Sequence, residues 1–264
     1  MVDQQQAASE PDLLRIDALS LSFGGLRVLD RISMSVPGGA VCGLVGPNGA
    51  GKTSLFNCVS GLYRPDSGQI LIGGADALRL ASHQLPKLGL ARTFQQPWLE
   101  PAATVLDNVL VGGHTRIRGG ALSLALRLPF VRRDEARLRR RAMEMLEYVD
   151  LAHAAKRAAG VLPFGSAKRV EIARALVAEP RLLMLDEPAS GVAHGEVEAL
   201  ADLVLRLRGE LGLTILLVEH HMGMVSAVTD KVVALVEGRK VAEGTAAQVR
   251  EHPTLIQAYL GTAA

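Results

Sequence analysis

The sequence predicts an α/β fold: a mainly parallel sheet with flanking helices, joined to an antiparallel β-subdomain and an α-helical subdomain. After residue 168, short apolar runs typical of buried strands alternate with helical patterns, which favours parallel strands with helices on both faces. Residues 13–36 instead contain two alternating segments separated by Gly24 and Gly25, as expected for a hairpin. The pattern over residues 104–151 is helical and predicts the helical subdomain.

The bulk composition is that of an ordinary globular protein. The chain has 264 residues, of which 48% are hydrophobic and 21% charged, and its net charge of +2 is too small to indicate nucleic-acid binding. Two cysteines are too few for a disulfide framework, which favours a reducing cytosol. No apolar run approaches the roughly 18 residues of a membrane span. Residues 1–11 are polar, lack a signal-peptide pattern and are expected to form a loose tail before one domain at residues 12–264.

The first part of the chain is predicted to form strands on either side of a glycine-rich loop. Pro37 and the two glycines after it end the second alternating segment, and residues 65–68 form a turn. The strands predicted here from alternation or short apolar runs cover residues 13–23, 28–36, 41–45 and 69–72.

The glycine-rich loop between the strand at 41–45 and the helix that follows is the most specific motif. It has the Walker A pattern G-x-x-x-x-G-K-T and predicts a P-loop NTPase core. Its backbone N–H groups and the helix N-terminus favour phosphate binding. Lys52 is expected to reach the β- and γ-phosphates, and the Thr53 hydroxyl to hold Mg²⁺. The predicted nucleotide-binding residues of this motif are Gly46, Pro47, Asn48, Gly49, Ala50, Gly51, Lys52 and Thr53.

The remaining elements follow from the same patterns. We expect the helical subdomain at about residues 96–178, and segment 112–130 within it has no clear assignment. Helices are predicted at residues 168–178, 195–211 and 246–260. Buried strands are predicted at residues 182–185 and 213–218, and a last hairpin at residues 231–236 and 239–243.

Two acids follow the buried strand at residues 182–185. Ligands bind beyond the carboxyl ends of strands in open α/β sheets, so both acids are expected in the site. Asp186 suits Mg²⁺, mostly through water. Adjacent residues on a strand point opposite ways, so Glu187 is expected to point away from Asp186 and to act as the general base that polarises the attacking water.

Three further side chains have both a functional and a structural interpretation. His220 follows the next strand and is predicted to sense the γ-phosphate, because histidine donates hydrogen bonds to phosphate and titrates near neutrality. Gln95 can ligate Mg²⁺ through its amide oxygen, or be a surface glutamine. Phe23 can stack on a purine ring or belong to the core, and spacing alone leaves both open.

In this order, the motifs resemble the nucleotide-binding subunits of ABC transporters, over nearly the whole chain from residue 13 to 261. The Walker A motif, the strand end at residues 185–188 and His220 fit that superfamily. The resemblance favours Gln95 as the mobile Mg²⁺ ligand and Phe23 as the aromatic that stacks on adenine.

A closer resemblance is to the ATP-binding proteins of branched-chain amino acid importers. Three features carry it: the glutamine loop Gly-Leu-Ala-Arg-Thr-Phe-Gln at residues 89–95, the extra helical segment after Asn108, and the ending His-Pro-Thr-Leu-Ile-Gln-Ala-Tyr-Leu-Gly at residues 252–261. This subgroup also includes importers of urea, other small amides and other hydrophobic compounds.

Two segments depart from the superfamily pattern. The signature Leu-Ser-Gly-Gly-Gln is here Leu-Pro-Phe-Gly-Ser at residues 162–166, so Pro163 removes a serine hydroxyl that would touch the γ-phosphate. Gly165 and the helix N-terminus after it remain available. The loop after Glu187 usually reads Gly-Leu-Asp or Gly-Leu-Asn, but Ala193 supplies no acid or amide. Communication between the two sites of a dimer is therefore in question.

The resemblance implies an ATPase that works as a head-to-tail pair. ATP with Mg²⁺ lies between the P-loop of one subunit and Phe164, Gly165 and Ser166 of the other. Closure drives separate membrane permeases, and hydrolysis through Glu187 and His220 resets them. The partners are thus a second ATP-binding subunit, identical or homologous, the permeases and, indirectly, a substrate-binding protein. The chain is expected on the cytoplasmic face of the inner or plasma membrane, with Trp98 near the permease.

Alternative functions differ in the features that they require. A low-turnover, nucleotide-gated structural subunit is favoured by Pro163 and Ala193. A P-loop kinase for a small molecule needs an acceptor pocket and a lid, and does not need a signature helix or His220. A soluble ABC ATPase acting on DNA or ribosomes usually has tandem cassettes or long coiled-coil inserts, which this sequence lacks. The transported substrate is not encoded in this chain, because the permeases and the binding protein select it.

Overall fold

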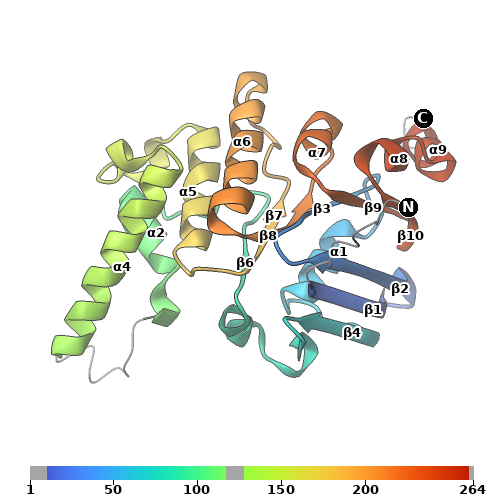
Figure 1. Cartoon of the computed structure of the whole chain (residues 1–264), viewed down its shortest axis with the longest axis horizontal. Coiled ribbons are helices and arrows are strands. Elements are labelled where there is room, and N and C mark those ends of the chain that lie inside the picture. Colours follow the sequence, from blue (N-terminus) through green and yellow to red (C-terminus); the bar gives the residue numbers. More distant parts are fainter. Residues whose placement is uncertain (1–10, 117–127, 262–264) are drawn as a thin grey trace, which may run out of the picture.

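The computed structural model describes residues 11–116 and 128–261, in two sheets with helices around them (Figure 1). Residues 1–10 of the expected tail and residues 117–127 of segment 112–130 lie outside the described residues. One sheet is antiparallel and has the strand order β2-β1-β4-β5. The other has the order β10-β9-β3-β8-β7-β6. The predicted combination of an α/β core with an antiparallel β-subdomain is therefore confirmed.

The antiparallel sheet contains the predicted hairpin. Strands β1 and β2 pair from Phe23 and Leu26 at the turn to Asp12 and Pro37 at the far end. Both turn glycines have positive φ, which residues with a Cβ rarely adopt. The strands of this sheet are β1 (Asp12–Phe23), β2 (Leu26–Pro37), β4 (Ser67–Ile72) and β5 (Ala75–Asp76).

The central sheet is parallel except at one edge. Strand β3 pairs in parallel with β8 and β9, and β7 pairs in parallel with β6 and β8, whereas β10 is antiparallel to β9. The predicted parallel strands therefore share a common carboxyl edge. The strands are β3 (Val41–Val45), β6 (Leu90–Arg92), β7 (Leu182–Asp186), β8 (Thr214–Val218), β9 (Lys231–Val236) and β10 (Arg239–Gly244).

Most α-helices follow the sequence pattern, but the helix at Met222–Val228 was not predicted and one prediction needs correction. The single closing helix predicted at residues 246–260 is wrong, because Pro253 cannot donate a hydrogen bond to a preceding turn and instead begins a second helix. The α-helices are α1 (Lys52–Val59), α2 (Val105–Val111), α4 (Pro129–Tyr148), α5 (Phe164–Leu176), α6 (His194–Leu211), α7 (Met222–Val228), α8 (Ala246–Arg250) and α9 (Pro253–Gly261). Five short 3₁₀ helices join the described elements: η1 (Ala77–Arg79), η2 (Ser82–Leu88), η3 (His114–Arg116), η4 (Ala152–Ala154) and η5 (Ala159–Val161).

The central sheet separates two hydrophobic cores. Along β7, Leu183 and Leu185 join the core formed with α2, α4, α5, α6 and α7, whereas Leu182 and Met184 join the core formed with α1 and the antiparallel sheet. Successive side chains of a strand point to opposite faces, so the continuous apolar run at 182–185 serves both cores. Figure 1 shows α5, α6 and α7 on one side of the sheet and α1 with β1, β2 and β4 on the other.

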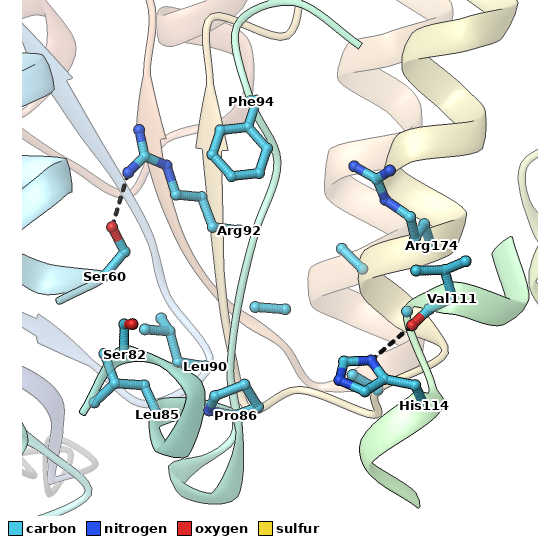
Figure 2. A pocket seen from close by; sticks show the side chains of 14 residues that line it. Ser60, Ser82, Leu85, Pro86, Leu90, Arg92, Phe94, Val111, His114 and Arg174 are labelled. Atoms are coloured by element: carbon cyan, nitrogen blue, oxygen red, sulfur yellow. Dashed lines mark hydrogen bonds between the residues drawn. The ribbon is translucent and has the colours of Figure 1, made fainter. Parts of the chain in front are cut away.

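A groove of about 330 Å³ lies beside the outer strand β6 (Figure 2). One wall comes from η2, including Leu85 and Pro86, and the opposite wall from Val111 of α2 and Arg174 of α5. Arg92 at the end of β6 lies between these walls. The groove therefore lies where the helices α2 and α5 meet the edge of the central sheet.

The assignment of the buried face of α6 can be tested by two truncations. Leu207 is fully buried in the core that covers β7 and β8, whereas Leu205 lies 38% exposed on the same helix. Leu207→Ala should lower the free energy of unfolding by about 2–5 kcal/mol, because it removes a packed side chain and leaves a cavity. Leu205→Ala should change it by about 0.5 kcal/mol or less. Urea denaturation followed by circular dichroism measures both, and equal losses would contradict this packing.

Candidate functional site

The loop between β3 and α1 has a backbone that requires glycine. Gly46 has φ of 149°, and a Cβ there would lie 2.1 Å from the carbonyl oxygen of Leu235. Gly51, the N-cap of α1, has φ of 97°, and a Cβ would lie 2.8 Å from Leu29. Any other residue at these two positions would strain the loop or displace a neighbouring strand. The sequence pattern thus corresponds to a tight loop at the N-terminus of α1.

Lys52 lies buried against its own loop. Its Nζ donates hydrogen bonds to the carbonyl oxygens of Gly46, at 2.6 Å, and Pro47, at 2.9 Å. Burial lowers the pKa of the Lys52 ammonium, and the nearby carboxylates of Glu187 and Asp186 oppose that shift. These contacts hold a partly desolvated cation next to the loop amides.

Asp186, the last residue of β7, is buried and paired with an arginine that sequence analysis missed. Arg92 Nη2 donates to Asp186 Oδ2 at 2.8 Å, and the two side chains are only 9% and 7% exposed. Arg92 ends the neighbouring strand β6, so parallel pairing of β6 and β7 brings the two together. A buried arginine beside strand residues gives no local sequence signal, because its partner is far away in the chain.

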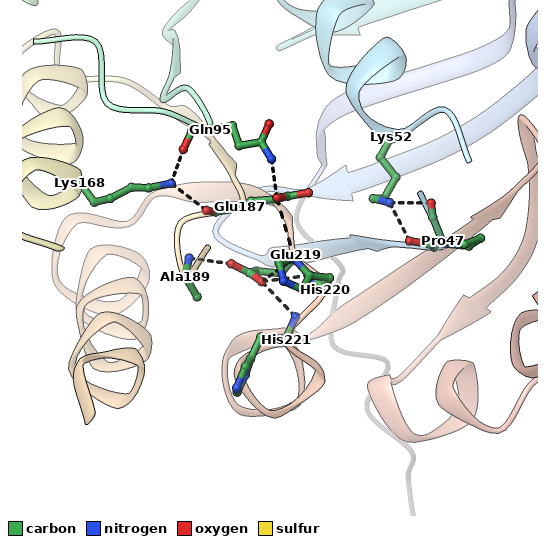
Figure 3. A network of polar contacts seen from close by, with 10 residues as sticks. Pro47, Lys52, Gln95, Lys168, Glu187, Ala189, Glu219, His220 and His221 are labelled. Carbon is green, nitrogen blue, oxygen red and sulfur yellow. Dashed lines mark hydrogen bonds and ion pairs between the residues drawn. The ribbon is translucent and has the colours of Figure 1, made fainter. Parts of the chain in front are cut away.

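Glu187 lies just beyond β7 and meets Gln95 and His220 there (Figure 3). Gln95 Nε2 donates to Glu187 Oε2 at 2.8 Å, and His220 Nδ1 lies 3.9 Å from the same oxygen. The structure therefore brings three of the predicted side chains together. The expected reason for the orientation of Glu187 is wrong, since this residue is not on the strand but has a left-handed backbone with φ of 47°.

Two charged side chains that sequence analysis did not assign connect the loops around Glu187 (Figure 3). Lys168 of α5 is buried, and its Nζ donates to the backbone oxygens of Gln95 and Glu187. Burial lowers the pKa of the Lys168 ammonium, and the acidic groups around it oppose this effect. Glu219 is fully buried and accepts hydrogen bonds from the backbone N–H groups of Ala189 and His220. The loops after β6 and β7 are thus each held by a side chain from another segment.

Two cavities contain half of the predicted site residues. Gly46, Pro47, Asn48, Gln95, Glu187 and His220 line the first, together with Tyr259 of α9, which sequence analysis did not assign to the site. Burial raises the pKa of Tyr259, opposed by a hydrogen bond with the Gly46 backbone. Thr53, Gln95 and Asp186 line the second cavity, with Arg92 and Phe94. Gln95 is common to both, so the two cavities adjoin at this side chain.

The second cavity has the donor chemistry of a magnesium site. Thr53, Gln95 and Asp186 supply a hydroxyl, an amide oxygen and a carboxylate, all hard oxygen ligands of the kind that Mg²⁺ takes. Among the described residues no cluster of three or more histidine, cysteine or acidic side chains is arranged to hold a metal. Mg²⁺ usually binds one or two carboxylates plus substrate phosphates rather than an all-protein cage.

Four predicted nucleotide contacts lie elsewhere. Phe23 is 46% exposed and forms an edge-to-face pair with Tyr63, with ring centroids 5.2 Å apart. Phe164, Gly165 and Ser166 form the first turn of α5. None of the four lines either cavity. Phe164 packs on the loop after Glu187, because a Cβ added at Gly191 would lie 2.9 Å from its ring. The signature segment and the loop after Glu187, which both depart from the superfamily pattern, therefore contact each other.

Comparisons with known proteins agree with this fold and loop arrangement. The family model described as ABC transporter matches residues 29–190. The chain is 39% identical over 251 residues to the high-affinity branched-chain amino acid transport ATP-binding protein BraF of Pseudomonas aeruginosa, covering 95% of this chain and 98% of BraF. It is also 39% identical over 255 residues to LivG of Escherichia coli, covering 97% of this chain and all of LivG.

Comparison with solved structures supports the same family. The ADP conformation of MJ1267, an ATP-binding cassette of an ABC transporter, superposes with a TM-score of 0.83 at 31% identity, covering 95% of this chain and 99% of that chain. Among the described residues, no helix combines the length and apolar character needed to cross a membrane. With a matching family model and a relative of 39% identity along nearly its whole length, the chain belongs to the ABC transporter family, as an ATP-binding subunit with ATPase activity.

Proposed function

We propose that the chain powers an importer of branched-chain amino acids or other amino acids, or of small amides such as urea, through separate membrane permeases. The observation that carries this proposal is the 39% identity to BraF over 95% of the chain, since BraF is named for branched-chain amino acid transport. The likeness to LivG of Escherichia coli supports the same cargo class. The loop geometry supports the ATP-driven mechanism described below.

Nucleotide binding is assigned to residues 46–53, with Phe23 stacking on the adenine ring. The amides of the loop and the N-terminus of α1 bind the phosphates. Lys52 exchanges the carbonyl oxygens of Gly46 and Pro47 for the β- and γ-phosphates, a short movement for a flexible side chain. A buried ammonium without a negatively charged partner is costly in free energy. Pairing of the Lys52 ammonium with phosphate is therefore favourable.

Magnesium is assigned to Thr53, Gln95 and Asp186. When bound with ATP, Mg²⁺ would supply positive charge that stabilises the charge developing in phosphoryl transfer. Gln95 currently uses its amide N–H on Glu187, which leaves its amide oxygen able to accept a metal. Asp186 has one oxygen engaged by Arg92.

Hydrolysis is assigned to Glu187 as general base and His220 as the group that contacts the γ-phosphate. Glu187 Oε2 faces the cavity that Gly46, Pro47 and Asn48 also line, where a carboxylate can accept a proton from water. Gln95 donates its own N–H to Glu187 Oε2, so a movement of Gln95 would leave that oxygen to accept from water as well. Hydrolysis thereby depends on the position of the loop that carries Gln95.

A second ATP-binding subunit, identical or homologous, supplies the other wall of the nucleotide site. Phe164, Gly165 and Ser166 of α5 are proposed to contact the nucleotide of the partner. These residues form the first turn of α5 and line neither cavity of their own chain, and the N–H groups of a helix N-terminus can bind phosphate, which supports that assignment. Residues 96–178 are proposed to act as a helical subdomain that carries this surface.

The groove beside β6 is the proposed contact for a permease at the cytoplasmic face of the membrane (Figure 2). It is lined by apolar side chains such as Leu85 and Val111, with Arg174 at its rim. Trp98, 81% exposed, lies in the adjoining loop, and Arg174 binds the Trp98 carbonyl. An exposed tryptophan beside an apolar groove is typical of a protein interface. The substrate-binding protein then acts only through the permeases.

A second candidate is a low-turnover, nucleotide-gated structural subunit of the same complex. The contact of Phe164 with Gly191 supports it, because both belong to segments that depart from the family pattern. Ala193 also gives α6 no side-chain cap. This candidate predicts that a reconstituted complex binds ATP but does not hydrolyse it.

Removing the amine of Lys52 should weaken nucleotide binding. Lys52→Ala loses charge-assisted hydrogen bonds to phosphate, each contributing about 1.5–3 kcal/mol, so ATP affinity should fall roughly tenfold or more. Titration with a fluorescent ATP analogue measures the change. Lys156→Ala, at an exposed lysine of the helical subdomain, is the control and should bind as the unmodified chain does. Full binding by Lys52→Ala would contradict the phosphate assignment.

Replacing Glu187 with glutamine should separate binding from turnover. Glu187→Gln keeps the size and one acceptor oxygen of the side chain but has no carboxylate to accept a proton, so ATPase rate should fall about a hundredfold or more while ATP still binds. The variant should also accumulate as a dimer with ATP, measured by size-exclusion chromatography with light scattering. Glu210→Gln, an exposed acid on α6, is the control. An unchanged ATPase rate in Glu187→Gln would exclude Glu187 as the base.

A further inference from the structure

Arg92 is a buried cation that the proposed chemistry does not use. It ends β6, and its Nη2 donates to Asp186 Oδ2 at 2.8 Å. Taking both charges out of water is costly, so such a pair is weak evidence for a purely stabilising role. The question is what the fixed guanidinium does for Asp186.

Five contacts fix the orientation of the Arg92 guanidinium. In addition to its bond to Asp186, Nη1 donates to Asn57 Oδ1 at 2.7 Å and to Ser60 Oγ at 2.8 Å (Figure 2 shows the bond to Ser60). The rings of Phe56 and Phe94 lie on the guanidinium, with its carbon 5.5 and 5.3 Å from their centroids. Because the planar guanidinium is bonded at both Nη atoms and contacts two aromatic rings, its orientation toward Asp186 is fixed.

These contacts connect Asp186 to the P-loop helix. Asn57 lies on α1, Ser60 is its C-cap, and Thr53 is in its first turn. Thr53, Asp186 and Arg92 line the same cavity. Arg92 thus spans from the far end of α1 to the carboxylate that, with Thr53, forms the proposed metal site. Its bond engages Oδ2, and a carboxylate has a second oxygen that can accept from metal-bound water.

We propose that Arg92 is a positioning residue for Mg²⁺ and nucleotide: it fixes the Asp186 carboxylate so that one oxygen serves the ion, without touching the nucleotide. The proposal rests on the magnesium assignment made above. Groups that orient metal ligands commonly determine metal affinity, because they set the direction and charge of the ligand atom. Lysine cannot replace this function fully, since it lacks the fork that reaches Asp186 and Asn57 together.

A merely structural ion pair and a positioning residue predict different binding data. Both predict lower stability when Arg92 is replaced, because Asp186 is left buried without a counter-charge. Only the positioning role predicts a change in the factor by which Mg²⁺ increases nucleotide affinity. That factor is the ratio of the Kd in EDTA to the Kd in Mg²⁺, and it needs no turnover.

The test measures this ratio by calorimetric titration of the full chain with a non-hydrolysable ATP analogue. Arg92→Met should lower the Mg²⁺-dependent gain about tenfold or more while the Kd in EDTA stays unchanged. Arg92→Lys should give an intermediate gain, and Asn57→Ala, which removes one anchor without touching Asp186, a smaller loss. Arg79→Met replaces an arginine that is exposed outside the groove, so it should match the unmodified chain.

The outcomes separate this proposal from the magnesium assignment. An unmodified chain with no Mg²⁺-dependent gain would overturn both. A normal gain in Arg92→Met, or an equal loss in Mg²⁺ and in EDTA, would overturn the positioning role alone. If Arg92→Met does not fold, as shown by its thermal melt, Arg92→Lys decides, and a full gain in that variant would overturn the proposal.

Discussion

Parallel pairing of β3, β8 and β7 is the constraint on which the site depends. Because parallel strands end at one edge, their loops deliver the P-loop, His220 and Glu187 to the same place, from positions far apart in the chain. The strands are buried on both faces, so helices and the antiparallel sheet must cover them. A change that shifts one strand therefore misplaces phosphate binding and catalysis together.

The loops at this edge are held by charged side chains rather than by packing alone. Lys168 connects the signature helix to the backbone of Gln95 and Glu187, and Glu219 connects Ala189 to His220. Both are buried, so breaking either connection leaves an unpaired charge in a poorly hydrated place. The loops that carry Gln95, Glu187 and His220 are therefore expected to move together rather than one at a time.

Sequence patterns identified what is encoded locally. The P-loop has a fixed spacing, and Asp186, Glu187 and His220 follow apolar runs, so their place at the sheet edge could be predicted. Arg92 and Lys168 could not be found in this way, because Asp186 and Gln95, their partners, are 94 and 73 residues away. The left-handed backbone of Glu187 and the break before Pro253 likewise depend on tertiary contacts or on one residue that overrides a helical pattern.

Arg92 and Phe94 line both the groove beside β6 and the cavity with Thr53 and Asp186, so they form a partition between two ligand sites. Thermodynamic linkage makes the coupling between two binding sites reciprocal. If an occupant of the groove changes the affinity of the chain for nucleotide and metal, then nucleotide and metal change its affinity for that occupant by the same factor. If the proposed membrane partner occupies the groove, its affinity for the cassette changes with nucleotide by that same factor.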